Sequence, residues 1–252
     1  MSTYVYAITA RSHPALPEGL DGVGNPPQPV RVLEEGELAA VVSDAPEDLR
    51  PKRRELLAHQ NVLAETGSTG CVLPLRFGSV APDDSKVTAV LAERANHYEE
   101  RLKALDGKVE YNLKASHVEE AVLHHVLADS PELRALVQAG RQAGGRSHER
   151  QLQLGEMIAA AVQAQEAQDA TAVQEALAPY AAATSLGPGS GGWLVNVSFL
   201  VERDSAAGFL EKVEELRAAV PHLEMSVNGP LPPYSFVEPG PARPAGTDGT
   251  DG

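Results

Sequence analysis

The stretch Thr3-Tyr4-Val5-Tyr6-Ala7-Ile8-Thr9 opens the chain as a strand with apolar side chains on both faces. Tyr4, Tyr6 and Ile8 are expected on one face and Val5 and Ala7 on the other, because successive side chains of a strand point to opposite sides. A strand that is apolar on both faces is typical of one covered on both sides. We therefore expect this strand to lie inside a sheet, with the rest of the first unit built around it.

The residues that follow predict a hairpin, a helix, a further extended segment and a second helix. The expected ranges are 29–42 for the hairpin, 54–65 for the first helix, 71–80 for the extended segment and 82–105 for the second helix. Leu56, Leu57 and Leu63 are expected on the inner face of the first helix, with His59 or Gln60 beside them. This order predicts a modified ferredoxin-like sandwich, with the helices on one face of an antiparallel sheet.

A second unit is expected from Gly107, with the same mixture of strands and helices. The expected ranges are a strand over 108–115, a helix over 116–137 broken at 130–131, a long Ala- and Gln-rich helix over 148–180, a strand over 193–202, a helix from 204 and a strand over 222–228. The fold class is thus α+β, with two ferredoxin-like units and an added long, coiled-coil-like helical segment. We expect domains over 1–106 and 107–238, and a disordered Pro/Gly-rich tail over 239–252.

The composition excludes several classes of function. The chain has 252 residues and a formal net charge of -14, which opposes binding to nucleic acids and to anionic membranes. We find neither a signal-peptide pattern nor an apolar run near the ~18 residues of a membrane span, so a cytoplasmic protein is expected. The single cysteine, Cys71, lies in an apolar run and is expected to be a buried structural thiol.

We find no residue motif that indicates a catalytic site. The glycines at 187, 189 and 192 fit a dinucleotide fingerprint, but a helix precedes them and a strand follows, which is the reverse of the required order. His117, Glu120 and His124 share one face of the predicted helix 116–137, with His125 beside them, yet no zinc-protease motif is present. We interpret that face as solvated, and expect no enzyme activity, cofactor or metal.

Two stretches are unusual in another way. Val72 to Gly78 reads VLPLRFG and places Pro74 and Arg76 inside a strand-like apolar run. Gly229 to Phe236 reads GPLPPYSF, a rigid, polyproline-like segment with two aromatic residues. Both stretches are compatible with strand-end packing, in which Arg76 donates hydrogen bonds to carbonyls or to a buried carboxylate. The alternative is a recognition surface.

Together with Tyr4-Val5-Tyr6 and Leu56-Leu57-Ala58-His59-Gln60, these stretches resemble the GvpL/GvpF family of gas vesicle proteins. The segments occur in the family's order over roughly residues 3–237, and VLPLRFG with GPxPPYSF is the specific combination. One departure is Leu231, where the family usually has Trp, which leaves only a local aromatic contact in doubt.

The resemblance implies a non-enzymatic accessory protein of gas vesicle assembly. It implies binding to the small hydrophobic shell protein GvpA and to other accessory proteins, and a cytoplasmic location associated with the vesicle. The motif residues expected to serve protein interaction or structure are His59, Gln60, Pro74, Arg76, Phe77, Pro232, Pro233, Tyr234 and Phe236.

Two other classes of function stay open from the residues alone. Ferredoxin-like sheets often bind metabolites, so a ligand-sensing regulatory module is one alternative, and it requires a concave pocket with convergent polar groups. A hydrolase or metal enzyme built around His59, Arg76 or the face with His117 and His124 is the other.

Overall fold

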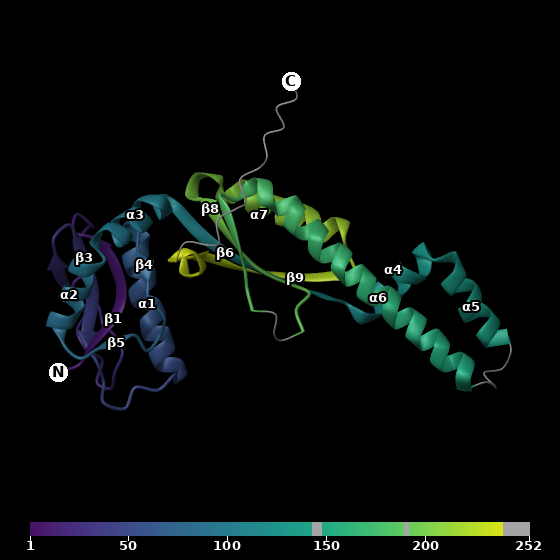
Figure 1. Ribbon diagram of the computed structural model, residues 1–252, viewed down its shortest axis with the longest axis horizontal. Helices are drawn as coiled ribbons and strands as arrows, with labels where there is room; N and C mark the ends of the chain where they lie inside the picture. The colour runs from purple at the N-terminus through teal and green to yellow at the C-terminus, as the bar shows by residue number, and fades with distance from the viewer. Residues whose placement is uncertain (143–147, 189–191, 239–252) are drawn as a thin grey trace, which may run out of the picture. The chain divides into compact units, whose positions relative to one another are not determined.

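The structure of the chain is a computed structural model that describes residues 1–142, 148–188 and 192–238 (Figure 1). Two compact units are present, one formed by Met1–Glu110 with the segment from Pro230 onward, and one formed by Tyr111–Gly229. The predicted tail over 239–252 and Gly189 of the glycine run lie outside the described residues. Within those residues, no helix is both long enough and apolar enough to cross a membrane.

The first unit is built on an antiparallel sheet with β1 at its centre. The strand order is β2-β3-β1-β4, and β5 also pairs with β1. Every residue of β1 except Ala10 is buried, which confirms the sequence prediction of a strand covered on both faces. The predicted faces of Ala7 and Ile8 are wrong, because a bulge between Val5 and Ala7 shifts the alternation: Ala7 lies with Tyr4 and Tyr6, and Ile8 lies with Val5. The strands are β1 (Thr3–Ala10), β2 (Arg31–Glu35), β3 (Leu38–Asp44), β4 (Leu73–Pro74) and β5 (Val80–Ala81).

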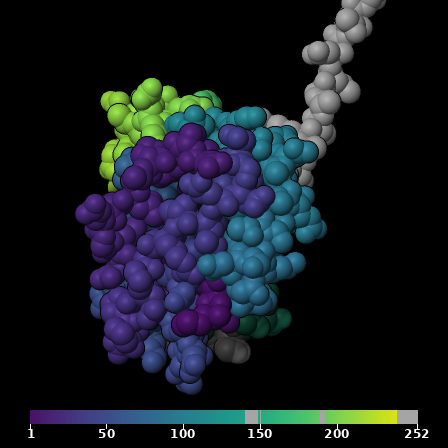
Figure 2. Space-filling view, turned by 90° about the vertical axis from the view of Figure 1, so that its left-hand side faces the viewer, coloured from purple at the N-terminus to yellow at the C-terminus, as the bar shows by residue number. Residues whose placement is uncertain are grey.

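Helices cover both faces of this sheet, so the expectation that they lie on one face only is wrong. Helix α1 (Arg53–Thr69) packs against the face that carries Tyr4 and Tyr6. Helices α2 (Asp84–Glu93) and α3 (Ala95–Leu105) face the opposite side, where Val5 lies. The physical reason is that β1 is apolar on both faces, and each face must be removed from water. Figure 2 shows the purple, blue and teal segments of this unit as one packed surface.

The buried face of α1 also differs from the prediction. Leu56 and Leu57 are 37% and 53% exposed, whereas Glu55 and His59 are buried with Val62, Leu63 and Thr66. The helix is rotated so that two polar side chains enter the core, where the groups described below bind them. A prediction from hydrophobicity alone places Leu56 and Leu57 in the core, because it does not include the free energy of buried hydrogen bonds.

The second unit has a four-stranded sheet of order β7-β8-β6-β9. Its strands are β6 (Lys108–His117), β7 (Ala183–Leu186), β8 (Val195–Glu202) and β9 (Leu223–Leu231). Helix α7 (Ala206–Ala219) packs on this sheet through Phe209, whose ring lies 5.4 Å from that of Phe199 and 5.3 Å from that of Tyr111. The strand expected from residue 193 starts at Val195, and Trp193 is 41% exposed.

Three helices of the second unit pack against one another. They are α4 (Glu119–Asp129), α5 (Pro131–Gln142) and α6 (His148–Leu177). Their shared core contains Val122, Val126 and Leu133, with partly buried side chains from α6 packed on it. Short 3-10 turns η1 (Ala178–Tyr180), η2 (Arg203–Ser205) and η3 (Tyr234–Phe236) complete the chain.

The segment from Pro230 to Glu238 packs with the first unit, whereas the sequence prediction placed it in the second. Sequence order alone favours the unit that immediately precedes a segment. Here two hydrogen bonds decide the placement: the Ser235 N–H donates to the Glu110 carboxylate, and Arg101 donates to the Val237 carbonyl.

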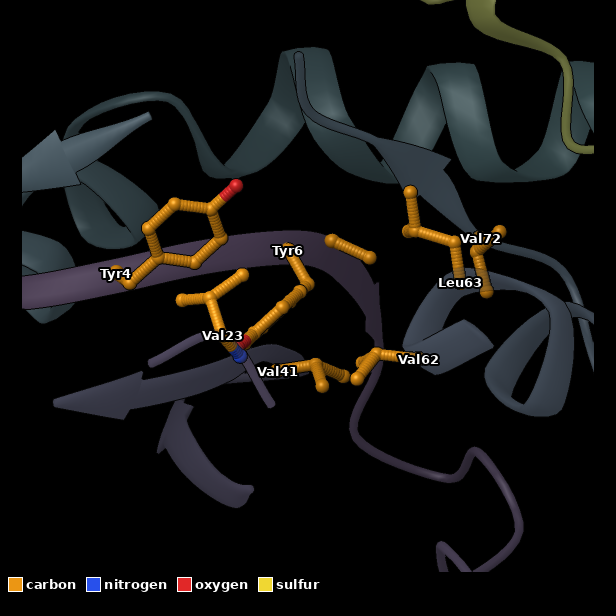
Figure 3. Packing of buried hydrophobic residues seen from close by; sticks show 8 residues of the cluster. Tyr4, Tyr6, Val23, Val41, Val62, Leu63 and Val72 are labelled. Atoms are coloured by element: carbon orange, nitrogen blue, oxygen red, sulfur yellow. The ribbon is translucent and has the colours of Figure 1, made fainter. Parts of the chain in front are cut away.

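The loop between β1 and β2 is fixed to the sheet by the Tyr6 side chain. The backbone N–H of Val23 donates to the Tyr6 hydroxyl at 2.8 Å, and that hydroxyl also lies 2.9 Å from the Ser43 hydroxyl. Figure 3 shows Val23 among the side chains of Tyr6, Val41 and Val62. A Cβ added at Gly22 would lie 2.1 Å from the Tyr6 hydroxyl, so only glycine fits.

We therefore expect Gly22→Ala to lower the free energy of unfolding by about 1–3 kcal/mol, because the methyl group must displace Tyr6 or the loop. The matched control is Gly208→Ala on α7, where nothing lies within 4 Å of the added Cβ. That control should be neutral or stabilising by up to about 1 kcal/mol, since alanine favours helices. Denaturant unfolding measures both, and equal stability of the two variants would contradict the role of Gly22.

Candidate functional site

The motif segments of the first unit meet at one buried histidine. His59, on α1, is 3% exposed. Its Nδ1 lies 2.9 Å from the Tyr4 hydroxyl, and its Nε2 lies 3.2 Å from the carbonyl oxygen of Leu75. A carbonyl can only accept, so Nε2 carries the proton and the Tyr4 hydroxyl donates to Nδ1. The N–H of Gly78 donates to the same hydroxyl at 3.2 Å.

Aromatic contacts surround this hydrogen-bonded chain. The rings of Tyr4 and Tyr6 lie 4.7 Å apart, and the Tyr6 ring stacks on that of His59 at 5.6 Å. Phe77 meets His59 edge-on at 5.8 Å. Such tilted and edge-on pairs add to the free energy gained by burying the rings. The YVY, LLAHQ and VLPLRFG segments thus form a single packed cluster.

Burial lowers the pKa of His59, although the hydrogen bond to the Leu75 carbonyl opposes the shift. Burial likewise raises the pKa of Tyr4, and the hydrogen bond from the Gly78 N–H partly offsets the increase. Near neutral pH the pair is therefore an uncharged hydrogen-bonded unit. Both ring nitrogens of His59 are engaged in this unit, one by the Tyr4 hydroxyl and the other by the Leu75 carbonyl.

A second buried polar contact lies at the start of α1. The carboxylate of Glu55, 5% exposed, accepts from the backbone N–H of Gly24 at 2.7 Å and from the guanidinium of Arg54. Burial raises the pKa of this carboxyl, but the hydrogen bonds from Arg54 and Gly24 outweigh that effect and the pKa is lowered overall. Glu55 therefore fixes the β1–β2 loop to α1.

The C-terminal motif is held by a buried carboxylate of β6. Glu110 is 3% exposed, and it accepts from the backbone N–H of Ser235 at 2.8 Å and from the Ser235 hydroxyl at 2.7 Å. Arg101 of α3 donates to the carbonyl oxygens of Phe236 and Val237. Tyr234 packs against the core cluster that contains Tyr4, and burial raises its pKa to about 12.

The structure thus divides the expected motif residues into two groups. His59, Pro74, Pro233 and Phe236 are buried, and Phe77, Pro232 and Tyr234 are half-buried. Gln60 and Arg76 are exposed, and in the described part of the chain no hydrogen bond or ion pair involves the Arg76 side chain. Arg76 is therefore not the structural donor to carbonyls or to a buried carboxylate considered from the sequence.

The expected histidine face of the second unit does not form as predicted. His117 ends β6 instead of lying on a helix, because the strand continues two residues past its predicted end. Glu120 and His124 on α4 are exposed, as a solvated face requires. The His117 side chain is only 8% exposed and lies against Asp169, so it is not solvated.

Sequence reasoning missed the buried acids Glu55, Glu110 and Asp169, and it missed His222. One sequence feature could have indicated a buried acid: Glu110 lies between two apolar residues of a strand, Val109 and Tyr111. The partners of these groups lie far along the chain, and no local pattern indicates them.

Comparison with known proteins identifies the protein family. The family described as "Gas vesicle synthesis protein GvpL/GvpF" matches residues 2–238. The chain belongs to this family. It is 65% identical to gas vesicle protein F of Streptomyces sp. (strain CB03234), over 94% of this chain and 100% of that protein. It is 30% identical to gas vesicle protein L of the same strain, over 93% of this chain and 92% of that protein.

Solved structures of GvpF share the fold of this GvpL/GvpF member. The crystal structure of GvpF from Microcystis aeruginosa superposes with a TM-score of 0.71 at 24% identity, covering 94% of this chain and 99% of that one. GvpF from Anabaena sp. PCC7120 gives 0.74 at 23% identity, covering 94% and 98%. The mixed fold of helices and antiparallel sheet is therefore a fold of the GvpF proteins. The family is one of gas vesicle proteins and not of enzymes.

The buried His59 predicts a pH dependence of stability. Its folded-state pKa lies below the unfolded value of about 6.5, so below that pH the unfolded chain binds the additional proton. The contribution is fully present above pH 6.5, and it is lost as pH falls toward the folded pKa, with a slope of at most about 1.4 kcal/mol per pH unit.

Denaturant unfolding between pH 5 and 8 measures this slope. His59→Gln should be less stable at pH 8 by about 1–3 kcal/mol, because it disrupts the bonds to Tyr4 and Leu75, and its stability should fall less steeply with acid. His124→Gln, at an exposed position, should keep the full slope. A variant of His59 with the same slope as the unaltered protein would contradict this assignment.

The contact between Glu110 and Ser235 predicts that Glu110→Ala releases the C-terminal motif. Loss of the carboxylate leaves the Ser235 N–H without its acceptor, at a cost of about 1–3 kcal/mol. Hydrogen exchange should then accelerate at the amides of residues 234–236, by about tenfold for each 1.4 kcal/mol of lost stability. Glu100→Ala on the exposed side of α3 is the control. Unchanged exchange in the Glu110 variant would refute the contact.

Proposed function

We propose that this protein is an accessory protein of gas vesicle assembly that binds the small hydrophobic shell protein GvpA and other gas vesicle proteins in the cytoplasm. The observation that carries the proposal is membership of the GvpL/GvpF family across residues 2–238. The relatives named gas vesicle protein F and gas vesicle protein L support it over nearly the full chain.

The outer face of α1 is the proposed contact surface. The LLAHQ motif places His59 in the core, while Leu56, Leu57 and Gln60 are exposed. These three residues lie on one side of the helix, because positions three and four apart are neighbours. Leu56 and Leu57 leave 37% and 53% of their surface exposed next to each other, and a partner's apolar side chains would cover this apolar area. An amphipathic segment of the shell protein fits such a face.

The charge of the chain supports the same role. A shell protein that is apolar on one face aggregates unless that face is covered before it joins the wall. A partner with a formal net charge of -14 keeps the complex dispersed through mutual repulsion. The charge also opposes binding to nucleic acid and to anionic membranes, which we do not propose as partners.

The ligand-sensing alternative receives less support. A cavity of about 230 Å³ lies between the sheet of the first unit and α2. Its lining is mainly aliphatic, with Ser79 and Lys86 as its polar members beside the phenol of Tyr98. A metabolite site needs several convergent polar groups to fix a ligand, and this lining is better suited to packing.

The finer description of the fold is also a proposal. We propose that each unit is a variant of the ferredoxin-like sandwich, and that α4, α5 and α6 form a coiled-coil-like addition to the second unit. The shared core of Val122, Val126 and Leu133 with side chains of α6 supports the helical part. Helices covering both faces of the first sheet mark the departure from the simple sandwich.

Association with the shell protein of the same organism tests the proposed function. Co-expression followed by pull-down should recover a complex, and the double variant Leu56→Ser/Leu57→Ser should weaken binding by about tenfold or more, equivalent to 1.4 kcal/mol. The matched control is Leu152→Ser on α6, since Leu152 is 59% exposed and lies in the other unit. Failure of the unaltered protein to bind would refute the function, and equal binding by both variants would refute only the α1 surface.

A further inference from the structure

Three polar side chains from distant parts of the second unit converge below its surface. His117 ends β6, Asp169 lies on α6, and His222 precedes β9. The two histidine Nε2 atoms lie 2.8 Å and 2.9 Å from the same oxygen of Asp169, its Oδ2. The side chains of the three residues are 8%, 9% and 8% exposed. Each offers one potential metal-ligating atom, and these atoms lie within 4.8 Å of one another.

Hydrogen bonding leaves this cluster incomplete. A carboxylate accepts only, so the Nε2 atoms of both histidines must donate to Asp169. The remaining ring nitrogen of His117, Nδ1, is buried and has no hydrogen-bond partner in the described part of the chain. A buried polar atom without a partner costs about 1–3 kcal/mol. Because no partner at Nδ1 holds the His117 ring in one tautomer, its proton can move from Nε2 to Nδ1, and Nε2 can then bind a cation through its own lone pair.

Side chains next to the cluster hold Asp169 and His222 in place, as is common around metal-binding residues. Gln165, one turn before Asp169 on α6, donates to its other oxygen, Oδ1, at 3.0 Å. The ring of His125 stacks on that of His222 at 4.1 Å. Burial raises the pKa of Asp169, but hydrogen bonds from His117, Gln165 and His222 outweigh this effect, so the carboxyl is held in its anionic form. Such outer contacts commonly fix the orientation of ligating side chains.

We propose that His117, Asp169 and His222 bind a divalent first-row transition-metal ion, with Zn²⁺ as the expected ion, and that the ion joins β6, α6 and the start of β9. Two imidazole nitrogens and one carboxylate oxygen suit zinc and its neighbours, whereas Ca²⁺ and Mg²⁺ prefer oxygen ligands alone. Around a tetrahedral ion with ligands at about 2.0–2.1 Å, the ligand atoms lie about 3.3 Å apart. The two N···O distances must therefore open by about half an ångström when the ion takes the place of the Nε2 protons, which move to the Nδ1 atoms of the same rings.

This inference departs from the sequence-based expectation of no metal. The expected face grouped His117 with Glu120 and His124, which are near it in sequence. The fold instead places it beside Asp169, 52 residues away, and Asp169 beside His222, a further 53 residues along. A structural ion at this point links the long helix α6 to the sheet, and it does so independently of any contact with the shell protein.

Direct titration tests the site. Untagged, full-length protein stripped with a chelator is titrated with Zn²⁺ in competition with a chromophoric chelator, and about one equivalent should bind. Zn²⁺ should also raise the unfolding temperature, because a ligand of the folded state alone stabilises it. X-ray absorption at the zinc edge should show two imidazoles among nitrogen and oxygen ligands.

Matched variants locate the ion. Asp169→Asn should weaken Zn²⁺ binding at least about 100-fold, since even residues that only orient ligands can contribute 10–100-fold. Glu166→Gln removes a similar charge from an exposed position of the same helix, and His124→Gln removes an exposed histidine of α4. Both controls should bind zinc as the unaltered protein does.

Two results of the binding measurements would overturn the proposal. One is the absence of stoichiometric zinc binding by the unaltered protein, and the other is equal binding by Asp169→Asn, which would indicate adventitious binding at surface histidines. If circular dichroism shows that Asp169→Asn does not fold, His222→Gln replaces it. The X-ray absorption spectrum of the zinc-bound, unaltered protein then tests the ligands directly. A spectrum without imidazole ligands would refute the site.

Discussion

The hydrogen bond between Tyr4 and His59 is the constraint on which the first unit depends. It places an imidazole of α1 in the centre of the core, between the strand β1 and the turn that carries Leu75 and Gly78. An uncharged pair with both partners satisfied is stable in an apolar core, while either group alone would be costly. The rotation of α1, the position of the VLPLRFG segment and the exposure of Leu57 all follow from this contact.

Buried carboxylates perform a related role at the edges of the same unit. Glu55 holds the β1–β2 loop, and Glu110 holds the C-terminal motif through Ser235. Each carboxylate accepts a hydrogen bond from a backbone N–H and so adds a fixed polar contact to a segment that also packs through apolar side chains, Val23 in the loop and Phe236 in the motif. Several motif residues, such as His59 and Phe236, lie in the core. Gln60 and Arg76 are exposed, and in the described residues no hydrogen bond or ion pair involves the Arg76 side chain.

In the second unit, polar contacts compensate for a weak apolar face. Helix α6 is rich in alanine and glutamine, so its packing against α4 and α5 buries few large side chains. Asp169 on this helix meets two histidines from the sheet side of the unit, and that contact joins α6 to elements more than fifty residues away. This contact fixes the position of α6, either through hydrogen bonds or through a metal ion. The narrow apolar stripe of the helix does not fix that position by itself.

The α+β class, the central buried strand β1 and the family could be predicted from the sequence, because the apolar run Tyr4 to Ile8 and motifs such as VLPLRFG are local patterns. The sequence also placed either His59 or Gln60 on the inner face of α1. The choice of His59 over Gln60, the exposure of Leu56 and Leu57, the contact of Ser235 with Glu110 and the meeting of His117 with Asp169 and His222 depend on the folded chain. These contacts join residues far apart in the chain, and their free energy comes from hydrogen bonds shielded from water. The periodicity of apolar residues within one segment contains no information about such contacts.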